Sequence, residues 1–386
     1  MKIGIITHYY NSKNYGGNLQ AYALQTFLSQ THDVEQICFV SKAAKSKCKI
    51  KGTRSNNPFV FTRRVFSRLG DAVCKILQKG KQSRIAPSLK TRSEAIARFN
   101  RAIPHSEEVY DENTIATALE RYDAFVTGSD QVWHPSAVNS AYLLQFVKGK
   151  RKISYAASLA VSTISPTYAE TLRESLRDYR AVSVREKTGQ ALLQPLIEQP
   201  VQVTVDPVLL LEKEQWETVA GTRIIENGYV FCYFFGVNKR ARSLATAYAR
   251  ARGLQVVTLP YLTERYRRCD EKWGDERLFD VSPADFLSLI RYADCVFTDS
   301  FHATVFSYIF QKEFFVFQRK KNGKLSSRLT DVLSVFGATE RFCDTKEKET
   351  LAYIQAVAPI EYLTESEALL RLKNQSKRFL NDALGG

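Results

Sequence analysis

The chain has 386 residues, of which 44% are hydrophobic and 25% charged, and its formal net charge is +15. This length accommodates two domains, and the composition is typical of a soluble globular protein. No apolar run approaches the roughly 18 residues of a membrane-spanning helix, and the stretch from Met1 to Thr7 is too short for a signal peptide. The seven cysteines show no CxxC spacing, which argues against a zinc site or a disulfide framework and favours a reducing cytoplasm.

The first 211 residues alternate between strand-like and helix-like segments. Apolar runs predict strands at 3–7, 34–40, 123–127, 152–158, 181–184 and 201–205, and helical periodicity predicts helices at 19–29 and 166–179. The first strand is followed by a polar loop, Asn14-Tyr15-Gly16-Gly17-Asn18. This order is typical of a Rossmann-like unit, but no GxGxxG motif indicates a dinucleotide. The paired glycines either let the backbone approach a ligand or form a plain tight turn.

A basic segment interrupts this first half between Lys42 and Arg92. It holds 15 lysines and arginines and one acid, Asp71, so its net charge of +14 accounts for nearly all of the excess. Apolar residues recur at helical spacing between positions 65 and 77. A basic amphipathic helix of this kind lies either on an anionic membrane surface or against its own domain with a solvated basic face. Nucleic acid is not favoured as a partner, because no aromatic-rich motif or zinc finger accompanies the charge.

The alternation restarts after Leu211. Strands are predicted at 229–235, 254–259, 295–297 and 314–318, and helices at 239–252, 283–292, 303–310, 325–336 and 366–380. Two successive runs of alternating strand and helix predict an α/β fold of two Rossmann-like domains facing a central cleft, 1–211 and 212–386. The last helix is expected to cross back and connect the two halves.

Polar side chains follow several of the predicted strands, where ligands bind in open α/β sheets. His302 stands where a strand gives way to a helix, after the capping pair Asp299 and Ser300. The free N–H groups of such a helix start favour an anion, and a histidine beside it is suited to proton transfer near neutral pH. Arg185 follows another strand and has the geometry to bind carboxylate or phosphate. The plainer interpretations are a histidine that packs a turn and an ion-paired arginine.

Several of these motifs together resemble the polysaccharide pyruvyl transferase family. Their order and spacing extend over about residues 1–340, and they comprise the strand Ile3-Gly4-Ile5, residues 14–24, Gly128-Ser129-Asp130-Gln131-Val132-Trp133, residues 154–158, residues 182–186, Asp206-Pro207 and Asp299-Ser300-Phe301-His302-Ala303. The resemblance implies a GT-B arrangement, in which two Rossmann-like domains have the active site between them. It makes 1–211 the acceptor side, with the basic insertion 42–92, and 212–386 the donor side.

The resemblance also implies an activity. It predicts transfer of a pyruvyl group from phosphoenolpyruvate to a sugar hydroxyl pair of a surface polysaccharide or its lipid-linked precursor, giving a pyruvate ketal and phosphate. The family histidine corresponds to His302, as a catalytic residue, and the family arginine to Arg185, as a donor ligand. Neither a cofactor nor a metal is expected, since phosphoenolpyruvate is itself a substrate.

Other site residues are assigned through the same resemblance. A later basic residue of the family lies among Lys321, Lys324 and Arg328, of which Lys324 and Arg328 are favoured as donor ligands together with Ser300. Many members carry an arginine before a Leu-His pair where this chain has Ser300-Phe301-His302. Asp130 is expected to hold or deprotonate the acceptor sugar, and the further acceptor contacts are Gly16, Gly17, Asn18 and Gln131.

Two alternatives from other classes stay open. One is a nucleotide-sugar-dependent glycosyltransferase on the same fold, although no nucleotide site is evident in the sequence. The other is a non-catalytic scaffold of saccharide assembly at the membrane surface. In either case the protein is expected in the cytoplasm, with residues 42–92 holding it at the inner face of the membrane.

Overall fold

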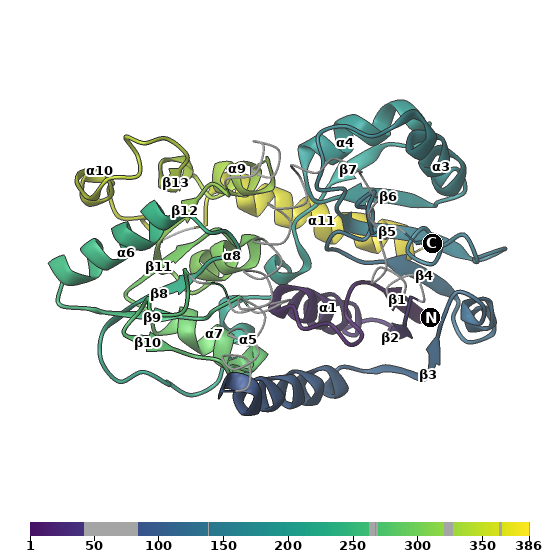
Figure 1. Ribbon diagram of the computed structural model, residues 1–386. Coiled ribbons are helices and arrows are strands. Elements are labelled where there is room, and N and C mark those ends of the chain that lie inside the picture. Colours follow the sequence, from purple (N-terminus) through teal and green to yellow (C-terminus); the bar gives the residue numbers. More distant parts are fainter. Residues whose placement is uncertain are drawn as a thin grey trace, which may run out of the picture.

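The computed structural model describes residues 1–41, 84–137, 139–261, 267, 269–319, 327–362 and 365–385. Two parallel sheets, each flanked by helices, form two α/β domains that lie side by side (Figure 1). This is the pair of Rossmann-like domains that the alternation of strands and helices predicts. Each sheet is hydrophobic along nearly the whole of its central strands, because helices cover both faces.

The first sheet has seven strands in the order β3-β2-β1-β4-β5-β6-β7. All neighbours are parallel. The strand order reverses between β1 and β4, which creates a crevice at their carboxyl ends. The strands are β1 (Lys2–Ile6), β2 (Asp33–Phe39), β3 (His105–Tyr110), β4 (Ala124–Thr127), β5 (Arg151–Ala157), β6 (Ala181–Val184) and β7 (Val201–Val203).

The second sheet has six parallel strands in the order β10-β9-β8-β11-β12-β13. Here the order reverses between β8 and β11, so this sheet repeats the winding of the first. Its strands are β8 (Tyr229–Tyr233), β9 (Gln255–Thr258), β10 (Glu276–Arg277), β11 (Cys295–Thr298), β12 (Glu313–Phe317) and β13 (Phe342–Cys343).

The helices begin at capping residues that the sequence supplies. Asn14, Ser165, Ser282 and Ser366 each accept a hydrogen bond from a backbone N–H in the first turn of the helix that follows. The helices are α1 (Tyr15–Leu28), α3 (Pro166–Leu176), α4 (Lys187–Leu193), α5 (Lys213–Val219), α6 (Lys239–Ala251), α7 (Pro283–Arg291), α8 (Phe301–Ile309), α9 (Ser327–Val335), α10 (Leu351–Ala356) and α11 (Glu367–Leu384), with short 3₁₀ turns η2 (Ile115–Glu120), η3 (Gln194–Leu196), η4 (Pro207–Leu209) and η5 (Thr339–Arg341).

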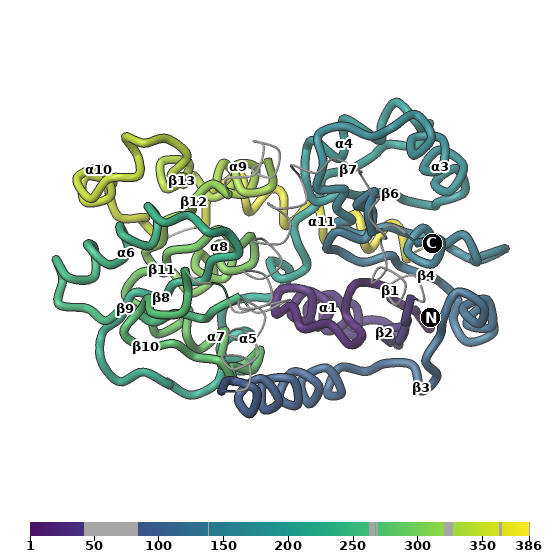
Figure 2. The backbone as a smooth tube through the Cα atoms, viewed as in Figure 1, coloured from purple at the N-terminus to yellow at the C-terminus, as the bar shows by residue number. Residues whose placement is uncertain are grey.

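The structure differs from the sequence-based expectation at several elements. Helix α1 begins at Tyr15, so residues 15–18 form its first turn and the glycine loop predicted there is wrong. A further helix over 84–102 runs near α1 (Figure 2). The ring of its residue Phe99 lies 5.8 Å from that of Tyr22 in α1. The sequence also did not reveal β3, whose HSEEVY pattern is half exposed because it is an edge strand.

Helix α11 passes from the second domain to the first, as the yellow ribbon in Figure 1 shows. Its residue Phe379 packs near Tyr155 of β5, and its Ser376 hydroxyl accepts the backbone N–H of Val205 at 3.0 Å. Arg180, just before β6, donates to the carbonyl of Ala383 at 2.9 Å. The last helix therefore completes the core of the domain in which the chain begins.

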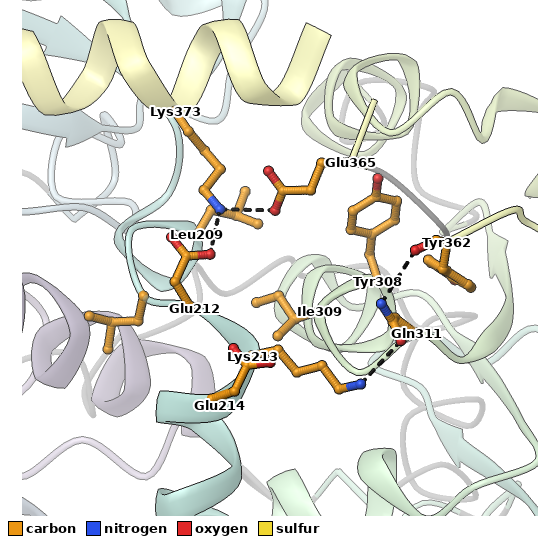
Figure 3. Close-up of a pocket in the computed structure, with 11 residues that line it drawn as sticks. Leu209, Glu212, Lys213, Glu214, Tyr308, Ile309, Gln311, Tyr362, Glu365 and Lys373 are labelled. Atoms are coloured by element: carbon orange, nitrogen blue, oxygen red, sulfur yellow. Dashed lines mark hydrogen bonds and ion pairs between the residues drawn. The ribbon is translucent and has the colours of Figure 1, made fainter. Parts of the chain in front are cut away.

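A pocket of about 260 Å³ lies where α11 begins and where the chain passes between the domains (Figure 3). Buried Lys373 binds two carboxylates there, Glu212 at 3.0 Å and Glu365 at 2.9 Å. Glu212 immediately precedes α5, so this cluster ties the interdomain connection to the crossing helix. None of the predicted site residues lines this pocket.

Most of the basic segment, 42–83, lies outside the described residues, and with it the amphipathic pattern at 65–77. Its contact with an anionic membrane stays a prediction. Among the residues that the structure does describe, no helix combines the length and apolar character needed to cross a bilayer.

The crossing helix offers a direct test of the core. Replacing Leu380, which is 0% exposed, with alanine is expected to lower the free energy of unfolding by about 2–5 kcal/mol, because a cavity replaces packed side-chain atoms. Leu370→Ala on the same helix, at a side chain 50% exposed, should change it by less than about 0.5 kcal/mol. Urea unfolding of both variants measures the difference, and equal effects would contradict the assignment of the buried face of α11.

Candidate active site

His302 lies in the first turn of α8, directly beyond the carboxyl end of β11. The N-cap of this helix is Ser300, whose hydroxyl accepts the backbone N–H of Ala303 at 3.4 Å. Asp299 does not share this capping role. Its carboxylate instead accepts the N–H groups of Phe235 and Gly236 at 2.6 and 2.7 Å, which ties the end of β11 to the end of β8. The imidazole of His302 is thereby fixed at the point where the strand order of the second sheet reverses.

The first domain meets this imidazole through the start of α1. A Cβ atom on Gly16 would lie 2.1 Å from Nδ1 of His302, so only glycine leaves room for the ring. Asn14 caps the helix by accepting the N–H of Gly16 at 3.1 Å, which makes a helix start possible despite the two glycines. The close approach of α1 to His302 brings the carboxyl ends of the two sheets together at one junction.

Arg185 reaches the same junction from the end of β6. Its Nη1 donates to Oδ2 of Asp206 at 2.6 Å, and its guanidinium carbon lies 4.4 Å from the ring centre of Phe301. The same Oδ2 atom lies 3.6 Å from Nε2 of His302 and accepts the hydroxyl of Ser129 at 3.1 Å. Burial would raise the pKa of Asp206, but His302 and Arg185 hold it far below its ordinary value. Asp206 is therefore a buried carboxylate that joins the arginine to the histidine.

Three buried nitrogen atoms at this junction have no hydrogen-bond partner among the residues that the structure describes. They are Nε and Nη2 of Arg185 and Nε2 of His302. Buried polar groups in folded proteins are almost always hydrogen-bonded, so such a cluster indicates a place where a ligand supplies the missing acceptors. The geometry leaves Nε and Nη2 of Arg185 free of hydrogen bonds to described residues, and Nε2 of His302 has only the Asp206 carboxylate nearby, at 3.6 Å.

A second guanidinium lies near the first. Arg328, in the first turn of α9, is buried, and burial together with the charge of Arg185 lowers its pKa to about 10. It remains protonated at neutral pH. In the amide orientation that satisfies its hydrogen bonds, the side-chain oxygen of Gln131 accepts a hydrogen bond from each terminal nitrogen of Arg328, both at 3.0 Å. The two arginines repel each other, and an anion between them would relieve that repulsion.

Asp130 lies on the first-domain side of the junction, after β4. Its φ of +72° is in the left-handed region, and an isolated bridge pairs it with Ala157. Burial alone would raise the pKa of its carboxyl, but nearby positive groups, with the largest effect from Arg185, lower it below the ordinary value. Asp130 is therefore ionised at neutral pH and faces the same positive groups.

The predicted site residues do not all contribute in the same way. The structure brings His302, Arg185, Arg328, Asp130, Gln131, Gly16 and Gly17 to this junction. Ser300 uses its hydroxyl as the cap of α8, and Asn18 is fully buried with its side-chain amide donating to the carbonyl of Ser12 at 3.3 Å. Lys321 and Lys324 lie outside the described residues.

Two residues at the junction were not assigned a role from the sequence. Asp206 belongs to one of the motifs that resemble the family but has no role assigned to it, although a carboxylate just after β7 satisfies the same rule that singles out Arg185 and His302. His8 follows β1 by two residues, and its ring packs edge-on against Tyr142 at 4.7 Å. Both residues could be found by considering every polar side chain that follows the carboxyl end of a predicted strand, because ligands bind there in open α/β sheets.

Solved structures similar to this chain share its two-domain architecture. The UDP-GlcNAc 2-epimerase from Methanocaldococcus jannaschii gives a TM-score of 0.55 at 10% identity and covers 100% of both chains. The UDP-N-acetylglucosamine 2-epimerase from Rickettsia bellii gives 0.55 at 10% identity, over 100% of this chain and 96% of that one. The UDP-GlcNAc 2-epimerase from Neisseria meningitidis, bound to UDP-GlcNAc, gives 0.52 at 11% identity and covers 100% of both. At such identities the likeness establishes the fold alone.

These structures and the junction geometry define a protein of GT-B fold, with a buried polar site between two Rossmann-like domains. The sequence model of the polysaccharide pyruvyl transferase family matches residues 14–321, and the chain belongs to that family. The protein is therefore a transferase. No curated protein matches its sequence.

The contact between α1 and His302 can be tested by adding a side chain at Gly16, where the ring of His302 occupies the place of a Cβ atom. We expect Gly16→Ala to displace the imidazole, because the new methyl group would overlap three ring atoms at 2.1–2.7 Å. Gly189→Ala in α4 is the matched control, since its methyl group would make ordinary contacts from 3.4 Å outward. The ring resonances of His302 in a ¹⁵N-labelled sample should shift only in the first variant. Unchanged resonances in Gly16→Ala would contradict the close packing.

The buried ion pair predicts a pH-dependent cost of removing Asp206. Asp206→Asn leaves the charge of Arg185 uncompensated, so the free energy of unfolding should fall by about 3–5 kcal/mol at neutral pH. Because the pKa of Asp206 is lowered in the folded state, its stabilising contribution is present above the unfolded pKa of about 3.9 and is lost as the pH falls below it. The difference between wild type and variant should therefore shrink below about pH 4.

An exposed ion pair provides the comparison. Glu367→Gln breaks the pair with Arg371, in which both side chains are at least 80% exposed, and should cost less than about 1 kcal/mol. Urea titrations across the pH range measure both variants. A loss for Asp206→Asn that does not exceed the one for Glu367→Gln would show that the buried pair does not hold the junction.

Proposed function

We propose that this transferase moves a pyruvyl group from phosphoenolpyruvate to a pair of hydroxyls on a saccharide, giving a pyruvate ketal and phosphate. The family match supports a polysaccharide pyruvyltransferase. The observation that supports the donor assignment is the cluster of buried nitrogens on Arg185 and His302 that make no hydrogen bond to a residue the structure describes. Phosphoenolpyruvate offers a carboxylate and a phosphate, the two groups that a guanidinium binds through parallel hydrogen bonds.

The energetics favour an anion at this position. A buried donor without an acceptor costs roughly 1–3 kcal/mol, and more when it is charged. Arg185 already gives one nitrogen to Asp206, so its remaining nitrogens can bind the carboxylate or the phosphate of the donor. Arg328 adds a second positive charge from the other domain, and its repulsion with Arg185 falls when a dianion lies between them. The positive groups would also stabilise the departing phosphate.

The reaction requires balanced proton transfers. Two saccharide oxygens form bonds to C2 of phosphoenolpyruvate, the bond from C2 to the phosphate oxygen breaks, and the electron pair leaves with the phosphate. Of the two hydroxyl protons, one replaces the double bond at C3 and the other ends on the phosphate. His302 can deliver the proton to C3, because its Nε2 atom makes no hydrogen bond to a described residue, the Asp206 carboxylate 3.6 Å away favours the protonated ring, and an imidazole exchanges protons near neutral pH.

Titration calorimetry tests the donor assignment. The wild-type protein should bind phosphoenolpyruvate, and Arg328→Met should weaken that binding by about 10- to 100-fold, since a hydrogen bond to a charged group is worth about 1.5–3 kcal/mol. Arg177→Met, at an exposed arginine beyond α3, is the control and should leave the affinity unchanged. Binding of nucleotide sugars but not of phosphoenolpyruvate would favour the glycosyltransferase alternative instead.

A second variant separates an enzyme from a scaffold. His302→Ala should weaken phosphoenolpyruvate binding by no more than about 100-fold, since a hydrogen bond to a charged group is worth about 1.5–3 kcal/mol. Release of phosphate in the presence of acceptor saccharides should nevertheless fall by about 10²–10⁴-fold, the usual contribution of a general acid. Turnover at the wild-type rate would show that His302 is not the proton donor.

A further inference from the structure

The two sheets place a histidine at each of their switch points. In the second sheet the strand order reverses between β8 and β11, and His302 follows β11. In the first sheet it reverses between β1 and β4, and His8 follows β1 while Asp130 follows β4. Ligands of doubly wound sheets bind at this point, beyond the carboxyl ends of the strands. The proposed donor reaction uses only the histidine of the second sheet.

The start of α1 brings these two positions together. Gly16 and Gly17 are adjacent in its first turn, and the absence of a side chain at each admits a different neighbour. A Cβ on Gly16 would lie 2.1 Å from Nδ1 of His302, whereas a Cβ on Gly17 would lie 2.8 Å from the backbone oxygen of His8 and 3.6 Å from Oδ2 of Asp130. The residues of the first-domain switch point and the imidazole of the second thus pack against the same helical turn.

The surroundings of His8 suit a group that accepts a proton. Its ring is held edge-on against Tyr142 at 4.7 Å and lies within electrostatic reach of the Asp130 carboxylate, while part of the residue stays exposed. Burial lowers the pKa of His8, and the opposing effect of Asp130 does not cancel this shift. His8 is therefore a neutral imidazole at physiological pH.

We propose that His8 is a second catalytic residue, which accepts the proton of the saccharide hydroxyl that attacks, and that Asp130 is its positioning residue. This inference rests on the proposed function. In the first step the hydroxyl oxygen forms a bond to C2 of phosphoenolpyruvate, its proton passes to His8, and the electron pair of the double bond takes a proton from His302 at C3. When the second hydroxyl displaces phosphate, its proton goes to the unprotonated His302, and the proton held by His8 passes to the leaving phosphate.

A single histidine does not suffice for the first step, because a proton is given to carbon while another is taken from oxygen. Two separate groups are therefore needed, one that gives a proton to C3 and one that takes a proton from the attacking hydroxyl. His302 belongs to the domain with Arg328, and His8 belongs to the domain that the family resemblance makes the acceptor side. The location of Asp130 beside His8 also changes its expected role from deprotonating the sugar directly to orienting and stabilising the imidazolium that does so.

The test compares His8→Ala with His32→Ala. His32 lies just before β2, whose first residues pair with the start of β1. It therefore lies at the amino ends of these strands, whereas His8 lies beyond the carboxyl end of β1. His8→Ala should lower kcat for phosphate release by about 10²–10⁴-fold. It should leave the calorimetric affinity for phosphoenolpyruvate within twofold of wild type, and added imidazole should restore part of the rate. His32→Ala should match wild type in all three measurements.

The outcomes separate this inference from the proposed function. If the wild type does not bind phosphoenolpyruvate, the donor assignment fails and the role of His8 fails with it. If the wild type binds and turns over phosphoenolpyruvate but His8→Ala keeps the wild-type rate, only the role of His8 is overturned. A slow His8→Ala variant that imidazole does not rescue, while His8→Gln is fully active, would indicate a packing role and would also overturn the proposal. Melting temperatures of both variants show whether they are folded.

Discussion

The ion pair between Arg185 and Asp206 is the interaction on which the junction of the two domains depends. Both side chains are almost fully buried, so their charges stabilise the structure only because each has the other, and a buried charge without its partner would cost several kcal/mol. The carboxylate also lies beside His302 and accepts the hydroxyl of Ser129. Arg185 after β6, Ser129 after β4 and His302 in α8 thus meet at one carboxylate oxygen of Asp206, which follows β7.

This constraint has a chemical consequence for the remaining atoms. Because Asp206 satisfies only one nitrogen of Arg185, the guanidinium keeps donors that no described residue uses, and it keeps them next to an imidazole. The stacking of Arg185 on the ring of Phe301 restricts its orientation further. The position before His302 that holds arginine in many family members is Ser300 here, which serves as a helix cap. The buried positive charges that the structure does place at the junction are those of Arg185 and Arg328.

Much of the fold could be predicted from the sequence, because the central strands are nearly continuous apolar runs. The strand predicted at 181–184 is β6 itself, and those that became β1, β8 and β12 lie within one or two residues of their predicted limits. Edge strand β3 was missed because half of its residues face solvent. The sequence predicts a loop at the first turn of α1, because glycine is a poor helix former. The glycine at position 16 is explained by a contact with the other domain, since a Cβ there would overlap the ring of His302.

The site was predictable only in part. Rules about strand ends single out His302, Arg185 and Asp130, and these residues lie at the carboxyl edges of the two sheets. The same rules do not say which side chains from different domains meet, since that depends on how the domains pack. The pairing of Arg185 with Asp206, and the placement of Gly16 against His302, are long-range contacts that no local sequence pattern specifies.

The path of α11 has a consequence for how the protein is made. The first strand of the first domain begins at Lys2, yet Phe379, Leu380 and Leu384 of α11, far along the chain, belong to the hydrophobic core that this domain shares. While the ribosome is still synthesising the second domain, those core positions have nothing to pack against. The core of the first domain is therefore complete only after α11 has been synthesised and has crossed back, and until then the apolar face that it covers is exposed.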